Sequence, residues 1–284
     1  MANSEGKVAL VTGASSGIGE ATARRLSEAG YVVYAGARRV ERMRGLAEGG
    51  LRVGQLDVTD DASMVDFVER AVAETGRVDV LVNNAGYGSY GALEDVPLAE
   101  ARRQFEVNVF GLARMTQLVL PHMRAHRHGY VVNISSIGGK FWEPLGSWYH
   151  ATKFAVEGLS DSLRVELRPH GVHVVIIEPG SISTEWTEIS AEHAARYSAE
   201  GPYAAQAAGL ARVLAPRRDG RPIGSSPEAV AKVIVRAVGS RHPRTRYAVG
   251  SGGKPITYAR RLLPDQIIDL AVGRLYRPEP ISSE

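Results

Sequence analysis

The sequence of 284 residues contains no cysteine. Disulfide bonds, thiolate nucleophiles and cysteine-based zinc sites are therefore excluded. It also lacks any apolar run near the ~18 residues of a membrane-spanning helix. The segment from Met1 to Lys7 lacks the basic and apolar regions of a signal peptide. We therefore expect no membrane span and a cytoplasmic location.

An excess of one charge is also missing, because 34 Lys and Arg stand against 31 Asp and Glu. A net charge of +3 without dense basic blocks is weak support for nucleic acid and suits an anionic small ligand equally well. His122, His126 and His128 have no carboxylate or cysteine beside them, so we expect no metal site. No repeat or linker interrupts the chain, which predicts one domain over residues 1–284.

The first motif follows a continuous apolar run, Val8 to Val11, which is typical of a strand buried on both faces. It reads Thr-Gly-x-x-x-Gly-x-Gly over residues 12–19, and Glu20 to Ala29 is then expected to be a helix. Glycines let the backbone approach a ligand, and a helix N-terminus attracts phosphate. About 0.01 chance matches are expected in this composition, so the pattern predicts a phosphate-binding loop rather than a plain glycine-rich turn.

Two arginines follow the second expected strand, Tyr31 to Ala37. In a dinucleotide-binding fold an acidic residue near this position holds the ribose 2′-hydroxyl. Arg38 and Arg39 would instead suit a 2′-phosphate, which guanidinium groups bind bidentately. The pair therefore indicates NADP rather than NAD, the alternative being two solvated arginines.

Strands and helices continue to alternate along the chain. We expect strands at 51–56, 78–82, 130–134, 172–177 and 247–249, and helices at 61–75, 98–127, 148–168 and 227–238. Asp60 or Asp61 is expected to cap the first of these helices, and the second is expected to be continuous or broken near Val107-Asn108 or at Pro121. The amides of Asn83 and Asn84, at a strand end, are expected to fix a neighbouring loop.

The second motif is the pair Tyr149 and Lys153, which lie four residues apart on an expected helix and so share one face. An ammonium nearby lowers the pKa of a phenol from about 10, which predicts a tyrosine able to exchange a proton with a carbonyl or alcohol oxygen. Ser136, or its rival Ser135, could hydrogen-bond the same oxygen. The pair alone has about 0.2 chance matches, so its meaning depends on the first motif.

Residues 185–226 are Ala-rich and expected to be irregular, with short helical pieces between Gly and Pro residues. Their place after the sixth strand predicts a mobile lid over the substrate; the alternative is a fixed insert at a subunit contact. A C-terminal tail over about 255–284 is apolar and basic up to residue 276 and is broken at Pro264.

Taken together, these motifs resemble the classical short-chain dehydrogenase/reductase family over residues 5–250. The matching residues are Thr12-Gly13-x-x-x-Gly17-x-Gly19, Asn83-Asn84-Ala85-Gly86, Asn108, Ser136, Tyr149-x-x-x-Lys153 and Pro179-Gly180-x-x-x-Thr184. The runs at 84–88 and 136–139 look closest to hydroxysteroid- and retinol-type dehydrogenases. The resemblance implies an α/β doubly wound Rossmann fold with a seven-stranded parallel sheet.

The resemblance also implies roles for single residues. Tyr149 would be the general acid/base, Lys153 would lower its pKa and contact the nicotinamide ribose, Ser136 would orient the substrate oxygen, and Asn108 would hold a relay water. The spacing to the tyrosine in the family favours Ser136 over Ser135. The implied cofactor-binding residues are Gly13, Ser15, Ser16, Gly17, Ile18, Gly19, Arg38, Arg39, Asp57, Val58, Asn84, Ala85, Gly86, Tyr149, Lys153, Pro179, Gly180, Ile182 and Thr184.

The sequence thus predicts an NADP(H)-dependent oxidoreductase that interconverts a carbonyl and a secondary alcohol, with NAD as the less favoured cofactor. A bulky apolar small molecule is the expected substrate, because several aromatic residues lie near the predicted pocket: Tyr87, Tyr90, Trp142, Trp148 and Trp186. The family also implies a homo-oligomer, a dimer or tetramer. A non-catalytic NADP-binding regulator is the main alternative, and an epimerase or dehydratase is disfavoured by the glycine spacing.

Overall fold

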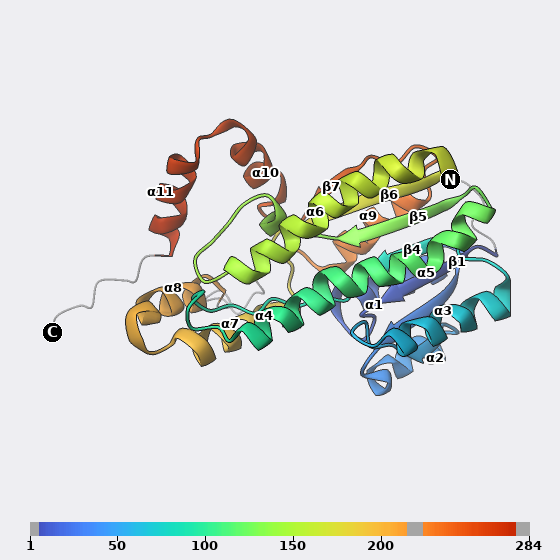
Figure 1. Ribbon diagram of the computed structural model, residues 1–284, viewed down its shortest axis with the longest axis horizontal. Coiled ribbons are helices and arrows are strands. Elements are labelled where there is room, and N and C mark those ends of the chain that lie inside the picture. The colour runs from blue at the N-terminus through green and yellow to red at the C-terminus, as the bar shows by residue number, and fades with distance from the viewer. Residues whose placement is uncertain (1–5, 215–223, 277–284) are drawn as a thin grey trace.

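In the computed structural model, one twisted sheet lies between two layers of helices, and the described residues are 6–214 and 224–276 (Figure 1). The strands of this sheet are β1 (Val8–Thr12), β2 (Val32–Ala37), β3 (Arg52–Gln55), β4 (Val80–Asn83), β5 (Gly129–Ile134), β6 (Val172–Pro179) and β7 (Arg246–Val249). All neighbours pair in parallel, in the order β3-β2-β1-β4-β5-β6-β7. The predicted Rossmann fold with a seven-stranded parallel sheet is confirmed.

Helices fill the connections between the strands. They are α1 (Gly17–Glu28), α2 (Arg44–Glu48), α3 (Asp61–Thr75), α4 (Leu98–Phe105), α5 (Leu112–Ala125), α6 (Ser147–Leu167), α7 (Glu185–Ser198), α8 (Ala204–Leu214), α9 (Pro227–Val238), α10 (Gly253–Leu262) and α11 (Asp265–Leu275). Side chains of α1 and α9 pack in one buried cluster, and those of α3, α5 and α6 in another. The two clusters cover opposite faces of the sheet.

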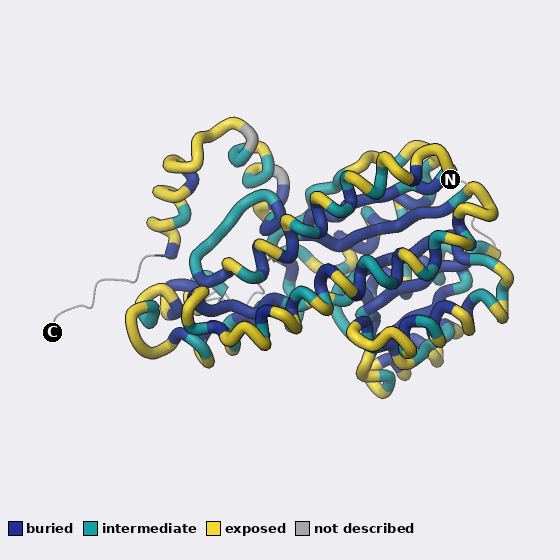
Figure 2. Tube along the Cα trace, viewed as in Figure 1, coloured by how far each residue is buried: buried dark blue, intermediate teal, exposed yellow. Residues whose placement is uncertain are grey.

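Strand β1 shows why the central strands read as unbroken apolar runs. Val8 and Leu10 pack in the cluster of α3 and α5, whereas Ala9 and Val11 pack in the cluster of α1 and α9. Successive side chains of a strand point to opposite faces, and here both faces are covered. Figure 2 shows the central strands as buried and the outer faces of the helices as largely exposed.

Several helix ends follow from local sequence. The side chain of Asp60, one of the two predicted caps, accepts a hydrogen bond from the Ala62 N–H at 3.1 Å. Helix α3 ends at Thr75 and is capped by Gly76, whose φ of 73° lies in the left-handed region that favours glycine. Helix α9 begins at Pro227, as predicted, because a proline needs no amide partner in the first helical turn.

The long helical stretch after residue 97 is interrupted at the first of its two expected positions. Residues Glu106–Gly111 form a π-helical turn between α4 and α5, whereas α5 continues through Pro121. Such turns often accompany functional sites, and this one carries Asn108. A Cβ at Gly111 would lie 2.3 Å from the Val58 carbonyl oxygen, which explains the glycine.

The expectation of irregular structure after residue 184 is wrong for 185–214, because α7 and α8 are regular helices. Alanine has the highest helix propensity, and the Thr184 hydroxyl caps α7 at the Trp186 N–H. Pro216, Gly220 and Pro222 lie outside the described residues, as does the tail beyond residue 276.

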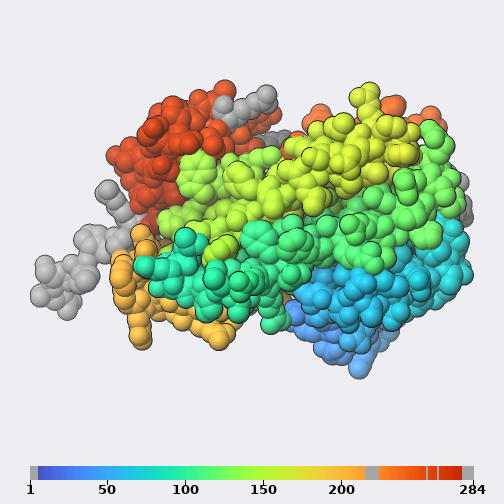
Figure 3. Space-filling model, viewed as in Figure 1, coloured from blue at the N-terminus to red at the C-terminus, as the bar shows by residue number. Residues whose placement is uncertain are grey.

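The described tail is the pair α10 and α11, divided at Pro264 as predicted. This pair forms an arch at one end of the molecule, seen in red beside α6 and α8 (Figures 1 and 3). No helix within residues 6–214 and 224–276 is long and apolar enough to cross a membrane.

Candidate active site

The predicted motifs meet at one edge of the sheet. Parallel strands end on the same side, so the segments after Thr12, Ala37, Asn83, Ile134 and Pro179 all begin there. Ligands of open α/β sheets bind outside this carboxyl edge.

The glycine-rich loop after β1 has the form that a phosphate site needs. Gly13 and Gly17 have φ values of 66° and 59°, and a Cβ at Gly19 would lie 2.3 Å from the Gly13 carbonyl oxygen. The side chain of Ser16, at the N-cap of α1, forms no capping hydrogen bond. The first amide groups of α1 therefore stay open to an anion, and the loop fits the pyrophosphate of a dinucleotide.

A hollow of about 470 Å³ borders this loop. It is lined by Ser15, Ser16, Gly17, Glu20, Ala21, Arg24, Arg42, Ser183, Thr184, Glu185, Pro227 and Glu228. The lining joins four segments that are distant in sequence. One of them contains Thr184, whose methyl group would lie 3.1 Å from a Cβ at Gly17. The lining contains Ser15, Ser16, Gly17 and Thr184 of the predicted cofactor residues.

Asn84 holds the glycine-rich loop against the end of β4. Its Nδ2 donates to the carbonyl oxygens of Thr12 at 3.0 Å and Gly13 at 3.1 Å. The Thr12 hydroxyl accepts from the N–H groups of Asn84 and Ala85. The predicted loop-fixing role of Asn84 is confirmed, and Ala85 lies directly beneath Gly13.

Arg38 and Arg39 follow β2 as predicted, but they differ in their partners. Arg39 lies 3.5 Å from the carboxylate of Glu185, and Arg42 also pairs with that carboxylate. Against the effect of burial, hydrogen bonds from Thr59 and the charge of Arg38 lower the pKa of the Asp57 carboxyl. Arg42 and Glu185 were missed by sequence reasoning, because 143 residues separate them and neither has a local signal.

Lys153 is buried at the centre of the site. Its Nζ donates a 2.9 Å hydrogen bond to the carbonyl oxygen of Ile134, and it lies 5.9 Å from the centre of the Tyr149 ring. Burial lowers the pKa of Lys153 to about 8, although Glu157 opposes the effect. The structure therefore brings Lys153 to Tyr149 and to the end of β5.

The expected lowering of the Tyr149 pKa is not found in this structure. Burial raises the pKa of the Tyr149 hydroxyl, the charge of Glu143 adds to the rise, and the hydrogen bond with Ser136 opposes it. The prediction was wrong because it considered the lysine and not the loss of water around a ring that is 6 % exposed. Of the two candidate serines, Ser136 is the one that contacts Tyr149.

Asn108 joins the loop after β4 to α6. Its Oδ1 accepts from the Tyr87 N–H at 3.0 Å, and its Nδ2 donates to the Tyr87 carbonyl oxygen at 2.9 Å and the Thr152 hydroxyl at 3.1 Å. A Cβ at Gly86 would lie 3.1 Å from Asn108 Oδ1 and 3.8 Å from Lys153 Nζ. Asn108 and Lys153 therefore flank the same glycine.

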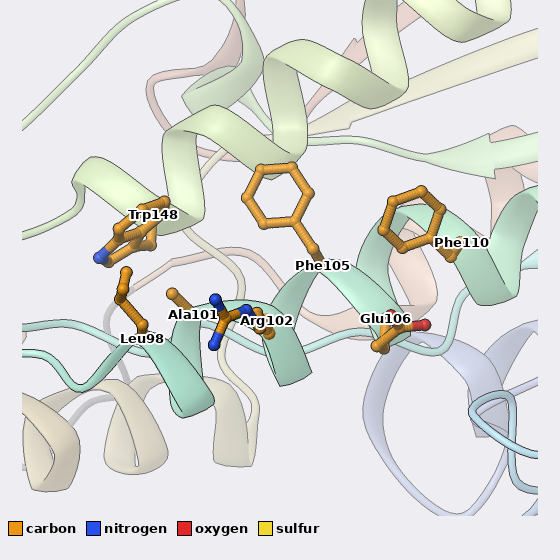
Figure 4. Close-up of a pocket in the computed structure, with 7 residues that line it drawn as sticks. All are labelled: Leu98, Ala101, Arg102, Phe105, Glu106, Phe110 and Trp148. Atoms are coloured by element: carbon orange, nitrogen blue, oxygen red, sulfur yellow. The ribbon is translucent and has the colours of Figure 1, made fainter.

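Two of the five aromatic residues expected near the pocket contact Tyr149. The ring centres of Trp186 and Tyr90 lie 5.2 Å and 5.6 Å from that of Tyr149. Trp148 lies elsewhere, because successive helical residues point about 100° apart. It lines a separate hollow between α4 and α6 with Leu98 and Phe105 (Figure 4).

The loop that carries Ser136 is held by contacts that the sequence does not signal. His150 Nδ1 lies 2.9 Å from the Gly138 carbonyl oxygen, and its Nε2 accepts the Glu143 N–H at 3.1 Å. The Glu143 carboxylate accepts hydrogen bonds from Tyr90 and from Tyr276, at the end of α11. Tyr276, at the end of α11, thus reaches the loop that carries Ser136.

The remaining predicted cofactor residues lie along the same edge. Asp57 and Val58 follow β3, while Pro179 and Gly180 end β6, where the Gly180 N–H donates to the Val249 carbonyl oxygen at 2.7 Å. Ile182 is buried in the cluster of α1 and α9. Ile18 begins α1 beside the glycines and is half-buried.

Comparison with known proteins agrees with this geometry. A sequence model described as short chain dehydrogenase matches residues 7–195. The chain belongs to the short-chain dehydrogenase family. Its relatives include an oxidoreductase of Bacillus subtilis named YusZ, 36% identical over 266 residues, which cover 91% of this chain and 94% of that protein. The chain is therefore an oxidoreductase of this family.

The chain is also similar to a named reductase and to two solved structures. A 3-ketodihydrosphingosine reductase of Bacteroides thetaiotaomicron is 43% identical over 182 residues, or 64% of this chain and 66% of that protein. A short-chain dehydrogenase of Streptomyces avermitilis superposes with a TM-score of 0.79 at 39% identity, covering 94% of this chain and 96% of that one. A metagenomic short-chain oxidoreductase solved with NADP superposes with a TM-score of 0.67 at 29% identity, covering 87% of this chain and 97% of that one.

Proposed function

We propose that this protein is an NADP(H)-dependent oxidoreductase that interconverts a carbonyl and a secondary alcohol. The observation that carries the proposal is the convergence of Ser136, Tyr149, Lys153 and Asn108 at the carboxyl edge of the sheet. When bound, the cofactor supplies a hydride to the carbonyl carbon or accepts one from the alcohol carbon. The protein supplies the binding site and manages the proton.

Tyr149 exchanges that proton with the substrate oxygen. Its raised pKa keeps the phenol protonated, which is the form that a reduction needs. Lys153, with a pKa of about 8, is charged at neutral pH and stabilises the phenolate left after proton donation. Ser136 orients the same oxygen. Both N–H groups of the Asn108 side chain are engaged, whereas its Oδ1 accepts one hydrogen bond and can accept a second, from a water of the proton relay.

The preference for NADP over NAD rests on Arg38 and Arg39, which follow β2 where the adenosine ribose lies in this family. A guanidinium binds a 2′-phosphate through charge-assisted hydrogen bonds. The relative solved with NADP supports the same cofactor. Asp57 and Val58 would lie against the adenine.

The substrate is an apolar carbonyl compound or alcohol. Tyr90 and Trp186 provide an aromatic wall beside Tyr149, and a relative is named for reducing a sphingoid ketone. The described part of the 185–226 insert, residues 185–214, acts as a lid, because α7 places Trp186 against the Tyr149 ring. This lid and the described tail, residues 255–276, belong to the same domain as the sheet.

Copies of the chain assemble into a homo-oligomer through the outer faces of α4 to α6. Leu98, Phe110 and Phe154 are 57%, 56% and 45% exposed there, and the first two line the hollow of Figure 4. Such apolar exposure is typical of protein interfaces. Phe110→Glu should reduce the molar mass measured by light scattering, and an unchanged mass would exclude this face.

The oxidation of NADPH in the presence of a panel of ketones of increasing chain length tests the main proposal. We expect turnover that increases with apolar chain length. If NADPH binds tightly and no compound of the panel is reduced, the protein is instead a cofactor-binding regulator.

A further inference from the structure

Two successive residues at the start of α7 contact the two halves of the site. Thr184 caps this helix, and Glu185 and Trp186 form its first turn. Side chains of successive helical residues diverge by about 100°, so the two point to different partners. Glu185 reaches the arginines after β2, and Trp186 reaches the catalytic tyrosine.

Glu185 contacts the guanidinium groups of Arg39 and Arg42, which a 2′-phosphate would bind. Its Oε2 lies 3.1 Å from Arg42 Nη1 and 3.5 Å from Arg39 Nη2. These groups are partly exposed, with 39% of the Glu185 side chain and 50% of the Arg39 side chain accessible. An exposed ion pair of this kind is weak, whereas a phosphate dianion binds guanidinium groups more strongly and repels a carboxylate.

The contact of Trp186 covers the catalytic ring. The indole packs against both Tyr90 and Tyr149, at ring-centre distances of 5.8 Å and 5.2 Å. A Cβ at Gly88 would lie 2.6 Å from the indole, so the loop after β4 fits closely around it. Tyr149 is only 6 % exposed, and this indole is one of the groups that pack on its ring.

We propose that Glu185 and Trp186 form an autoinhibitory latch that the 2′-phosphate of NADP(H) releases. The phosphate, held by Arg38, binds the guanidinium groups of Arg39 and Arg42 and so displaces the Glu185 carboxylate. The first turn of α7 then moves, and Trp186 leaves Tyr149 open to the carbonyl compound. NADH lacks this phosphate and leaves the latch closed. This proposal rests on the proposed binding of NADP(H). It predicts that the cofactor binds before the substrate.

Hydrogen exchange of the intact protein tests the latch with two probes, adenosine 2′-monophosphate and adenosine 5′-monophosphate. We expect the 2′-isomer to increase deuterium uptake across residues 184–190 of the wild type and the 5′-isomer to leave it unchanged. In Glu185→Gln the uptake should be high without a probe and insensitive to both. Glu188→Gln, which removes an exposed charge from the same turn, should behave as the wild type.

Steady-state kinetics provide a second readout. Glu185→Gln should raise the NADH-supported kcat/KM for a ketone by about two- to fivefold, the range that an exposed ion pair supports. The NADPH-supported kcat/KM, measured at saturating NADPH, should rise by a smaller factor, because the phosphate has already displaced Glu185 in the wild type. Binding of the 2′-isomer, measured by calorimetry, without any change of uptake in 184–190 would overturn the latch and leave the NADP preference intact. Equal affinity for the two isomers would overturn both the latch and the NADP preference.

Discussion

His150 holds Gly138 through a 2.9 Å contact between its Nδ1 and the Gly138 carbonyl oxygen. Because Nε2 of the same ring accepts the Glu143 N–H, the ring proton must lie on Nδ1. The Gly138 N–H in turn donates to the Ser136 hydroxyl at 3.0 Å. His150, the residue next to Tyr149, therefore positions the loop that carries Ser136.

Replacing this imidazole should loosen the loop. In His150→Leu a carbonyl oxygen and an N–H lose their partner in a buried place, which costs about 1–3 kcal/mol for each group left unsatisfied. We expect a lower free energy of unfolding in urea and a lower kcat. His170→Leu, at an exposed position, should change neither. Equal stability of the two variants would show that His150 is not a positioning residue.

The proton role of Tyr149 predicts that Tyr149→Phe abolishes turnover while NADPH still binds. A general acid/base contributes about 10²–10⁴-fold in rate, and this phenol is the donor that the mechanism places at the reacting oxygen. Single-turnover kinetics and a fluorescence titration with NADPH measure the two effects. Activity near that of the wild type would refute the assignment.

The cofactor preference predicts a selective effect of Arg38→Ala. A charge-assisted hydrogen bond contributes about 1.5–3 kcal/mol, so the affinity for NADPH should fall roughly 10- to 150-fold. The affinity for NADH should be nearly unchanged, since no phosphate is lost. Calorimetric titration of both cofactors measures the difference. A loss shared equally by the two would mean that Arg38 supports the fold rather than the phosphate.

A pH dependence of stability follows from Glu178, at the end of β6. Burial and then the nearby Glu157 raise its pKa to about 7, although Lys140 and Arg246 oppose the effect; Asp161 adds slightly to it. Between pH 4.5 and about 7 the native protein keeps a proton that the unfolded chain has lost. The stabilisation is therefore complete below pH 4.5 and decreases as the pH rises through about 7.

Glu178→Gln keeps the neutral form at every pH. Its free energy of unfolding should fall less steeply from about pH 5 to 8 and exceed that of the wild type at about pH 8, by on the order of 2 kcal/mol. Urea unfolding at several pH values measures the slopes. Glu166→Gln, at an exposed position of α6, should keep the wild-type slope. Parallel profiles for wild type and Glu178→Gln would contradict the prediction.

The sequence by itself determined the sheet, the glycine-rich loop and the placement of Tyr149 and Lys153 on one face of a helix. These features depend on local patterns: unbroken apolar runs for strands covered on both faces, glycines where φ is positive, and a spacing of four on a helix. The cap at Asp60 was predictable for the same reason, since it acts within its own element. That Asn84 fixes a neighbouring loop was also predicted, but its partners Thr12 and Gly13 were set by the fold.

Only the tertiary structure decided which distant residues contact these parts. The pairing of Arg42 with Glu185, the contact of His150 with Gly138 and the packing of Trp186 on Tyr149 depend on how distant elements meet. The rise of the Tyr149 pKa has the same origin, because burial by those elements removes the water that a phenolate needs. A sequence lists the charged and aromatic groups, but their burial and partners are set by the folded chain.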